Sequence, residues 1–235
     1  MIVSCLIPFR DADGTRTRAH HWMLARWRYF WPDWEYIVAS DDGVDPFNKS
    51  MAVNKAAKQA TSDVLAILDA DTWIEPQYVE QSLEAIERGV PWVVPARRSL
   101  RLKQEISEYI LDTDPTAPTY PRIRTSAIEQ AGAVVGFLWF VPREGFAKLG
   151  GMDERIRGWG GEDTVFTRAA DVMLGNHLRL AGTVVSLWHA RPRDVDRKRI
   201  WLGQGRRRDD VDKEALVARY RSAHSPAAMA EVLAR

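Results

Sequence analysis

The chain is organised around a stretch that reads Val64-Leu65-Ala66-Ile67-Leu68-Asp69-Ala70-Asp71-Thr72. Its first five residues form a continuous apolar run, which is typical of a strand buried on both faces. Two carboxylates spaced i, i+2 follow, so they lie at the carboxyl end of the predicted strand, where open α/β sheets bind ligands. Their oxygens suit a hard divalent cation that carries a diphosphate. A solvated Asp-x-Asp turn before the next helix is the simpler interpretation of these residues alone.

Strand and helix patterns alternate from residue 2 to residue 95. Apolar runs bounded by turn residues predict strands, and apolar residues at helical spacing predict helices between them. The predicted strands are 2–7, 35–39, 64–68 and 91–95, and the predicted helices are 15–30, 51–60 and 76–88. This alternation predicts an α/β fold with a mostly parallel, twisted sheet flanked by helices.

The second half of the chain has a looser pattern. It predicts a helix at 100–111, a loop at 112–121, a strand at 133–141 interrupted by Gly136, helices at 143–149 and 164–174, and a strand at 183–188. Glycine within a strand often marks the close approach of a ligand or another backbone. The tail after residue 190 is polar and partly helical. We expect a single domain over residues 1–190 and a basic C-terminal extension over residues 191–235.

The composition indicates an ordinary globular protein. In 235 residues there are 33 basic and 32 acidic side chains, so the overall charge gives no reason to expect nucleic acid or a membrane as partner. No apolar run approaches the length of a membrane span. The single cysteine, Cys5, allows no internal disulfide, and Met1-Ile2-Val3 lacks the basic start of a signal peptide. We therefore expect a soluble protein of the cytoplasm. The ten tryptophans favour either a buried core or stacking on sugars.

A second acidic pair follows a loop with three glycines in four positions, Gly158-Trp159-Gly160-Gly161-Glu162-Asp163. Carboxylates in the first turn of a helix are favoured by the helix dipole, which accounts for the acids but not for the glycines or the indole. Glycines let the backbone approach a ligand closely, and a carboxylate at the end of such a loop is able to act as a general base toward a hydroxyl. We therefore favour a functional role for Glu162 and Asp163.

His189 follows the last predicted strand. A histidine at a strand end is more often structural than a metal ligand. In a chain with an Asp-x-Asp pair at another strand end, however, it supplies the nitrogen ligand that suits Mn²⁺ beside carboxylates.

The order of these motifs resembles that of the β-1,4-galactosyltransferase family and, more loosely, of family 2 glycosyltransferases with the GT-A fold. The resemblance covers residues 2 to about 190 and rests on Ile7-Pro8-Phe9-Arg10, Phe47-Asn48-Lys49, Val53-Asn54-Lys55-Ala56, Leu68-Asp69-Ala70-Asp71, Gly158-Trp159-Gly160-Gly161-Glu162-Asp163 and His189. It implies a GT-A domain with a nucleotide-binding half at 1–95 and an acceptor and catalytic half at 96–190.

The resemblance also implies a role for each matching residue. The donor, a UDP-sugar, would be held by Pro8, Phe9, Arg10, Asp41, Phe47, Asp69, Gly136, Trp159 and Gly160, with Phe47 against the uracil and Asp69 at the ribose. Asp71 and His189 would ligate Mn²⁺ or Mg²⁺. Glu162 would hydrogen-bond the acceptor, and Asp163 would be the catalytic base of an inverting transfer.

Three departures from the galactosyltransferase pattern bear on these roles. Asp11-Ala12 stands where the family has Asn-Arg, so a second arginine contact is missing unless Arg16 or Arg18 replaces it. Arg157 stands where the family has a tryptophan. Ser186 stands where the family has a methionine metal ligand, which leaves the third protein ligand unassigned.

Other interpretations of the chain remain open at this stage. A retaining GT-A enzyme that acts on a glycan or lipid-linked precursor would use the same fold. A nucleotidyltransferase would need a glycine-rich phosphate loop after the first strand, and Phe9 to Gly14 holds one glycine. A non-catalytic sugar- or nucleic-acid-binding protein would not need the acids and the histidine.

The segment 191–208 holds eight basic residues and two aspartates, a local net charge of +6, with Trp201 among them. It suits either a loop over the donor diphosphate or a surface that contacts nucleic acid. As acceptors we expect a hydroxyl on a glycan, a protein or a modified DNA base, in a bacterial or phage-infected host cytoplasm.

Overall fold

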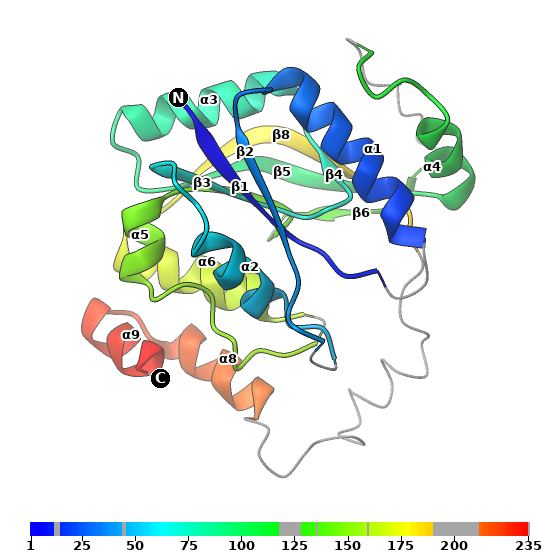
Figure 1. The fold of residues 1–235 in the computed structure, drawn as a ribbon. Coiled ribbons are helices and arrows are strands. Elements are labelled where there is room, and N and C mark those ends of the chain that lie inside the picture. Colours follow the sequence, from blue (N-terminus) through cyan, green and yellow to red (C-terminus); the bar gives the residue numbers. More distant parts are fainter. Residues whose placement is uncertain are drawn as a thin grey trace.

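The computed structural model describes residues 1–11, 15–43, 46–117, 128–134, 136–158, 160–189 and 212–234. This part of the chain forms one α/β domain in which a sheet lies between two layers of helices (Figure 1). The predicted α/β class, with helices on both faces and a partly helical C-terminal tail, is confirmed.

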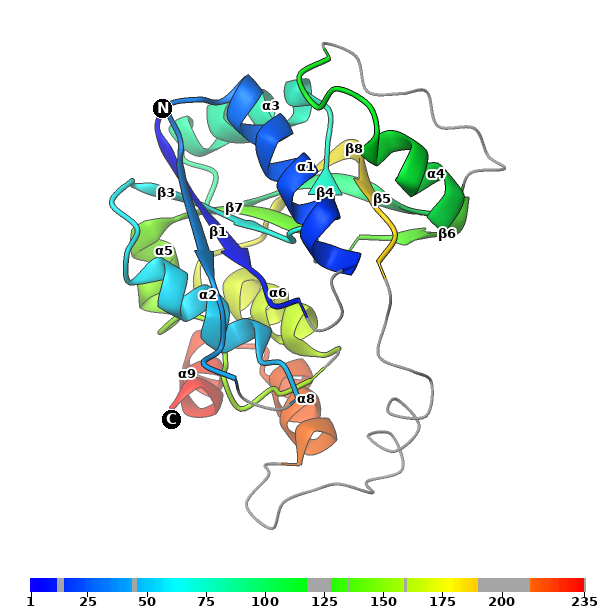
Figure 2. The ribbon, with the colours of Figure 1, turned by 45° about the vertical axis from the view of Figure 1, so that its right-hand side comes forward.

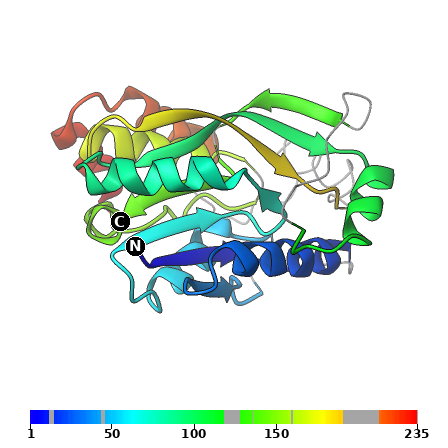
Figure 3. The ribbon, with the colours of Figure 1, turned by 90° about the horizontal axis from the view of Figure 1, so that it is seen from above.

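The described part of the sheet has eight strands in the order β2-β1-β3-β7-β5-β8-β4, and β6 pairs with β5. Their bounds are β1 Val3–Pro8, β2 Glu35–Ala39, β3 Val64–Leu68, β4 Thr72–Trp73, β5 Val93–Leu102, β6 Ile128–Ala133, β7 Leu138–Pro142 and β8 Leu178–Ser186. All six residues of β1 and all five of β3 are buried, as their apolar runs predict. Seen from above, the sheet is strongly twisted (Figure 3).

The described sheet is mixed: β1, β2, β3, β5 and β8 run in one direction, as a mostly parallel sheet requires, and β4, β6 and β7 run in the other. β1 pairs in parallel with β2 and β3, and β5 pairs in parallel with β8, but β7 is antiparallel to both β3 and β5. β4 and β6 are also antiparallel to their partners. One residue separates β5 from α4 (Gln104–Leu111), and β6 then pairs with the C-terminal half of β5. The chain thus turns back at that end of the sheet instead of crossing over it, so the next two strands, β6 and β7, run antiparallel to β5.

The predicted strand at 133–141 is two strands in the structure. β6 and β7 both run antiparallel to β5, so they run in one direction, with a break after Ala133, where β6 ends, and before Leu138, where β7 begins. At this break Phe137 has a φ of +76°, a conformation that side chains other than glycine seldom adopt. β5 also extends to Leu102, over residues expected to begin a helix.

Helices cover both faces of the sheet. α1 (Thr15–Phe30) and α3 (Pro76–Glu87) lie on one face, and α2 (Lys49–Ala57), α5 (Arg143–Lys148) and α6 (Glu162–Met173) lie on the other (Figure 1). α4 lies beside α1, away from the C-terminal helices (Figure 2). α2 begins where the Asn48 side chain accepts a hydrogen bond from the Met51 amide, and α3 has Pro76 in its first turn.

The C-terminal helices α8 (Lys213–Ser222) and α9 (Pro226–Leu233) pack against α6 as an outer layer (Figure 2). Their apolar residues Leu216, Tyr220, Met229 and Val232 are buried and belong to the hydrophobic core. Residues of the predicted extension therefore contribute to the packing of the domain.

Many of the tryptophans belong to the core. Trp22, Trp27, Trp34, Trp73, Trp92 and Trp139 are buried. Trp27 joins α1 to β4, because its indole N–H donates to the Thr72 carbonyl at 2.9 Å and its ring contacts Trp73 at 5.1 Å. The core interpretation thus holds for these six. Among the described residues, no helix combines the length and apolar character needed to span a bilayer.

Candidate active site

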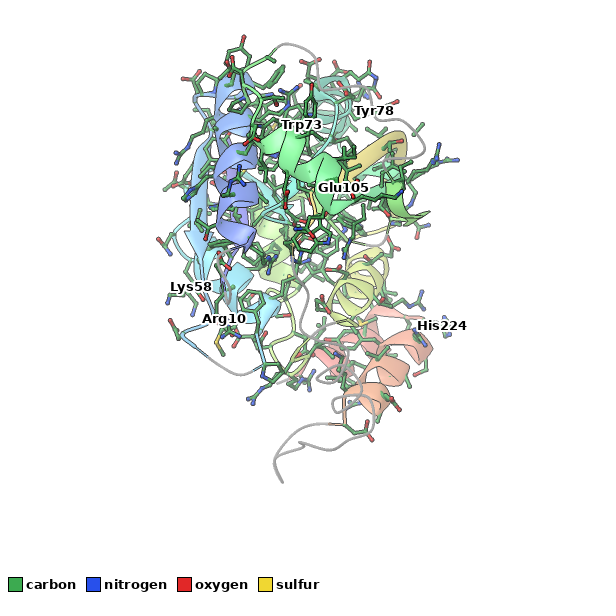
Figure 4. All side chains as sticks on the ribbon, turned by 90° about the vertical axis from the view of Figure 1, so that its right-hand side faces the viewer. Arg10, Lys58, Trp73, Tyr78, Glu105 and His224 are labelled. Carbon is green, nitrogen blue, oxygen red and sulfur yellow. The ribbon has the colours of Figure 1, made fainter. Side chains whose placement is uncertain are left out.

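Three of the residues predicted to hold the donor lie together at one edge of the sheet. β1, β2 and β3 are parallel and end at Pro8, Ala39 and Leu68, so the residues after them meet there. Arg10 forms an ion pair of 3.0 Å with the fully buried Asp41, and its guanidinium lies 5.1 Å from the centre of the Phe47 ring. Figure 4 shows Arg10 beside α2. Arg10, Asp41 and Phe47 therefore form one cluster.

Phe9 and Asp11 have structural contacts within the same segment. Phe9 stacks on His20 of α1, with ring centres 4.4 Å apart. The Asp11 carboxylate accepts a hydrogen bond from the Thr17 amide at 2.9 Å. The aspartate that departs from the galactosyltransferase motif therefore binds the first turn of α1.

Lys49 joins two of the predicted site acids. Its ammonium lies 2.7 Å from Asp69 Oδ1 and 2.9 Å from Asp163 Oδ1, although these residues are 94 positions apart in sequence. Burial alone would lower the pKa of Lys49, but the carboxylates of Asp163 and Asp69 outweigh it and raise the pKa. Lys49 is thus a stable cation at the centre of the site. The sequence patterns assign no role to Lys49, although it directly follows Phe47-Asn48 in one of the motifs that carry the resemblance.

Gly136 makes room for Asp163. A Cβ at position 136 would lie 1.9 Å from Asp163 Oδ2, a separation that no pair of unbonded atoms tolerates. The next residue, Phe137, accepts a hydrogen bond from the Asp69 amide at 2.9 Å. The break between β6 and β7 therefore contacts both acids that Lys49 joins.

Glu162 begins α6 beside Asp163. Burial and the neighbouring Asp163 carboxylate raise the pKa of Glu162 to about 7. Its Oε2 atom is buried and has no hydrogen-bond partner within the described part of the chain. A carboxyl group in this state is suited to hydrogen-bond a hydroxyl that enters the site.

The two aspartates of the Asp-x-Asp pair face different partners. Asp69 turns to Lys49, whereas Asp71 accepts a hydrogen bond from the Ser186 hydroxyl and lies 3.8 Å from His189 Nε2. Burial alone would raise the pKa of Asp71, but His189, Arg16, Ser186 and Arg101 together lower it. Asp71 is therefore ionised at neutral pH.

Asp71 and His189, the two expected metal ligands, lie within 3.8 Å of each other. Within the described ranges, no group of three His, Cys, Asp or Glu side chains has the arrangement of a closed metal centre. A carboxylate and an imidazole still fit a hard cation that takes its other ligands from water and substrate phosphates. Ser186, at the position of the family's methionine, hydrogen-bonds to Asp71 instead.

Two further sequence expectations concern the glycine loop and the tail. Gly160 has a φ of +85° and open space where a side chain would begin, in keeping with a loop that lets backbone approach a ligand. Trp159 and the segment 191–208 lie outside the described residues.

Two family models match the chain. The model described as Glycosyl transferase family 2 matches residues 43–149, and the one described as the N-terminal domain of galactosyltransferase matches residues 126–173. The matched segments contain Lys49, Asp69, Asp71, Gly136, Glu162 and Asp163, which the fold brings to one edge of the sheet. The chain is a glycosyltransferase. The resemblance noted in the sequence is thereby confirmed, and so is the expectation of a nucleotide-sugar-dependent enzyme.

Among solved structures, this glycosyltransferase is distantly similar to two enzymes. One is the catalytic domain of Drosophila β1,4-galactosyltransferase 7 in complex with xylobiose, with a TM-score of 0.47, 16% identity, and coverage of 96% of this chain and 82% of that chain. The other is the mannosyltransferase PcManGT from Pyrobaculum calidifontis in complex with GDP-Man and Mn²⁺. Its TM-score is 0.48 and its sequence identity is 15%, and the match covers 98% of this chain and 67% of that chain. No curated protein matches the sequence.

Proposed function

We propose that this glycosyltransferase transfers a sugar from a UDP-sugar to an acceptor hydroxyl with inversion of configuration, and that Asp163 is the catalytic base. The observation that carries this proposal is the Asp69–Lys49–Asp163 bridge. It holds a carboxylate from the glycine loop beside the strand ends where Arg10, Asp41 and Phe47 would receive the nucleotide.

The residues around the bridge support a division of roles. Arg10 and Phe47 would contact the uridine part of the donor, and Asp69 its ribose. Asp71 and His189 would hold Mn²⁺ or Mg²⁺ against the diphosphate. A divalent ion bound there would neutralise the negative charge that develops on the departing UDP.

The transfer itself needs one base. Asp163 takes the proton of the acceptor hydroxyl as its oxygen forms a bond to the anomeric carbon, and the bond from that carbon to the diphosphate breaks. UDP leaves with the electron pair of the broken bond. Glu162 hydrogen-bonds the acceptor, and Lys49 stays charged and keeps the carboxylate of Asp163 in place.

For the acceptor we propose a hydroxyl on a macromolecule, either a protein or a modified DNA base, in preference to a free sugar. The support is the sequence of segment 191–208, with a local net charge of +6 and an interleaved Trp201. Incubation with each acceptor and a UDP-sugar, followed by mass spectrometry, tests this. Rapid transfer to simple monosaccharides, with DNA and protein unmodified, would contradict it.

The test of the reaction is the release of UDP from a panel of UDP-sugars in the presence of Mn²⁺. We expect Asp163→Asn to lower kcat by about 100-fold or more, the usual size of a general-base contribution. Asp71→Ala should lower activity and weaken metal dependence. Asp63→Asn, at an exposed acid paired with Arg143, is the matched control. Unchanged turnover in both site variants would refute the assignment, and retention of the anomeric configuration by NMR would refute inversion.

A further inference from the structure

We propose that Arg16 and Arg101 bind the phosphate groups of the nucleotide donor. They would supply the cationic contact that is missing after Arg10, where Asp11-Ala12 replaces the family's Asn-Arg. This inference rests on the proposed function, because it names contacts for the same donor.

Arg101 lies in one row with residues of the metal site. On β5 it is in register with Ser186 of β8, and Ser186 is in register with Thr72 of β4, the residue after Asp71. Side chains in register on neighbouring strands project to the same face of a sheet. Because the Ser186 hydroxyl donates to Asp71, Arg101 projects from the face on which Asp71 lies.

Arg16 lies in the first turn of α1. Its Nε atom is buried and has no hydrogen-bond partner among the residues that the structure describes. Both Arg16 and Arg101 act electrostatically on Asp71. Arg18, the other candidate from the sequence, is exposed and pairs with Asp112 at 2.9 Å. Of the two arginines considered for the missing contact, the structure therefore favours Arg16.

The charge at this position suits an anion that carries more than one negative charge. Two guanidinium groups act electrostatically on the single carboxylate of Asp71, Ser186 adds no charge, and Arg101 forms no ion pair within the described residues. Guanidinium groups match phosphate oxygens with two parallel hydrogen bonds, which makes arginine a strong phosphate ligand. A diphosphate between Arg16 and Arg101 would give both groups a partner beside Asp71 and His189.

The test is calorimetric titration of the full chain with UDP, uridine and inorganic pyrophosphate. We expect Arg16→Met and Arg101→Met each to raise the Kd of UDP and of pyrophosphate at least tenfold, with the Kd of uridine unchanged. The loss should persist in EDTA, because it comes from protein cations and not from a metal ion. Arg16→Lys and Arg101→Lys should keep part of the affinity for UDP and pyrophosphate that the methionine variants lose.

Arg18→Met and Arg98→Met are the matched controls, since both arginines are exposed and lie on the same helix and the same strand as the tested pair. Circular dichroism and thermal unfolding of each variant show whether the fold is kept. UDP and pyrophosphate affinities within twofold of the original in both folded variants would overturn the inference and leave the proposed function intact. A chain that binds neither UDP nor pyrophosphate would overturn both.

Discussion

The buried ammonium group of Lys49 forms ion pairs with two carboxylates in this site. Unpaired charges inside a protein are costly, and two neighbouring carboxylates without a cation favour protonation of one of them. Lys49 offsets part of this cost for Asp69 and Asp163 through contacts of 2.7 and 2.9 Å, although burial and the carboxylates of Asp163 and Asp71 still raise the pKa of Asp69. The acid proposed as the base of the reaction is therefore held in place by a residue from another element.

Replacement of Lys49 by methionine should impair catalysis more than folding. We expect kcat to fall by about 100-fold, in the range of a lost general base, because Asp163 loses the ammonium group that lies 2.9 Å from it. Steady-state kinetics measures kcat, and circular dichroism shows whether the fold is kept. Lys55→Met, which removes an exposed pair with Asp42, is the control and should leave kcat unchanged. An unchanged kcat in a folded Lys49→Met variant would contradict this role.

Glu162 should make stability fall as pH rises. Its pKa of about 7 in the folded state exceeds the ordinary value of 4.5, so between these values the folded chain binds more protons than the unfolded chain. The free energy of unfolding therefore decreases as pH rises through this window. Glu162→Gln removes the effect, and we expect it to be more stable than the original chain at pH 8, with a smaller difference at pH 5.

Urea unfolding at the two pH values measures this difference. Glu80→Gln, at an exposed position of α3, is the control and should show no such pH dependence. Equal effects of Glu162→Gln at pH 5 and pH 8 would show that the group does not titrate in this window.

At the scale of elements, the break between β6 and β7 shapes the catalytic edge. In this break, Gly136 lies against the Asp163 carboxylate, and the Phe137 carbonyl accepts a hydrogen bond from the Asp69 amide. A break in a strand at this position thus sets the places of two acids that come from separate parts of the chain.

Gly136→Ala should displace Asp163, because the added carbon would lie 1.9 Å from its carboxylate. We expect a loss of activity close to that of Asp163→Asn, and a loss of stability of about 1–3 kcal/mol, as for other overpacked positions. In an Asp163→Gly background the stability loss should largely disappear. A double-mutant cycle by chemical denaturation measures this coupling, and additive effects would argue against the contact.

Sequence patterns predicted the elements better than their directions. Apolar runs located β1, β2 and β3, and the acids after β3 fall at the sheet edge as expected. The direction of β7 could not be read in this way, because an apolar strand looks the same in parallel and antiparallel pairing when both faces are buried. Lys49 was missed for a similar reason: its pairing with Asp69 and Asp163 depends on contacts that periodicity does not encode.

At the scale of the whole molecule, the C-terminal helices form hydrogen bonds with the loop that precedes α6 and its acids Glu162 and Asp163. The Tyr220 hydroxyl donates to Asp153 at 2.8 Å, Arg155 donates to the Val232 carbonyl at 2.7 Å, and Lys213 donates to the Arg157 carbonyl at 3.1 Å. These contacts precede Glu162 and Asp163 by only a few residues, so α8 and α9 support the loop from outside the sheet.

Tyr220→Phe should destabilise the chain, because it removes a buried hydrogen bond to the Asp153 carboxylate. We expect a loss of about 1.5–3 kcal/mol, the usual value for a hydrogen bond to a charged group. Urea denaturation measures it. Tyr29→Phe, at a residue that is half exposed, should change stability by less than about 0.5 kcal/mol. Equal effects of the two substitutions would contradict the role of Tyr220.

The position of α8 also has a consequence for synthesis on the ribosome. Lys213 is made 56 residues after Arg157 and Tyr220 is made 67 residues after Asp153, the residues of the loop that they contact. While translation is under way, the sheet and the acids at its edge are already available, but the loop before Glu162 still lacks these partners. Activity should therefore begin only once α8 has emerged from the exit tunnel, so that a nascent chain stalled before residue 212 is inactive although most of its sheet is complete.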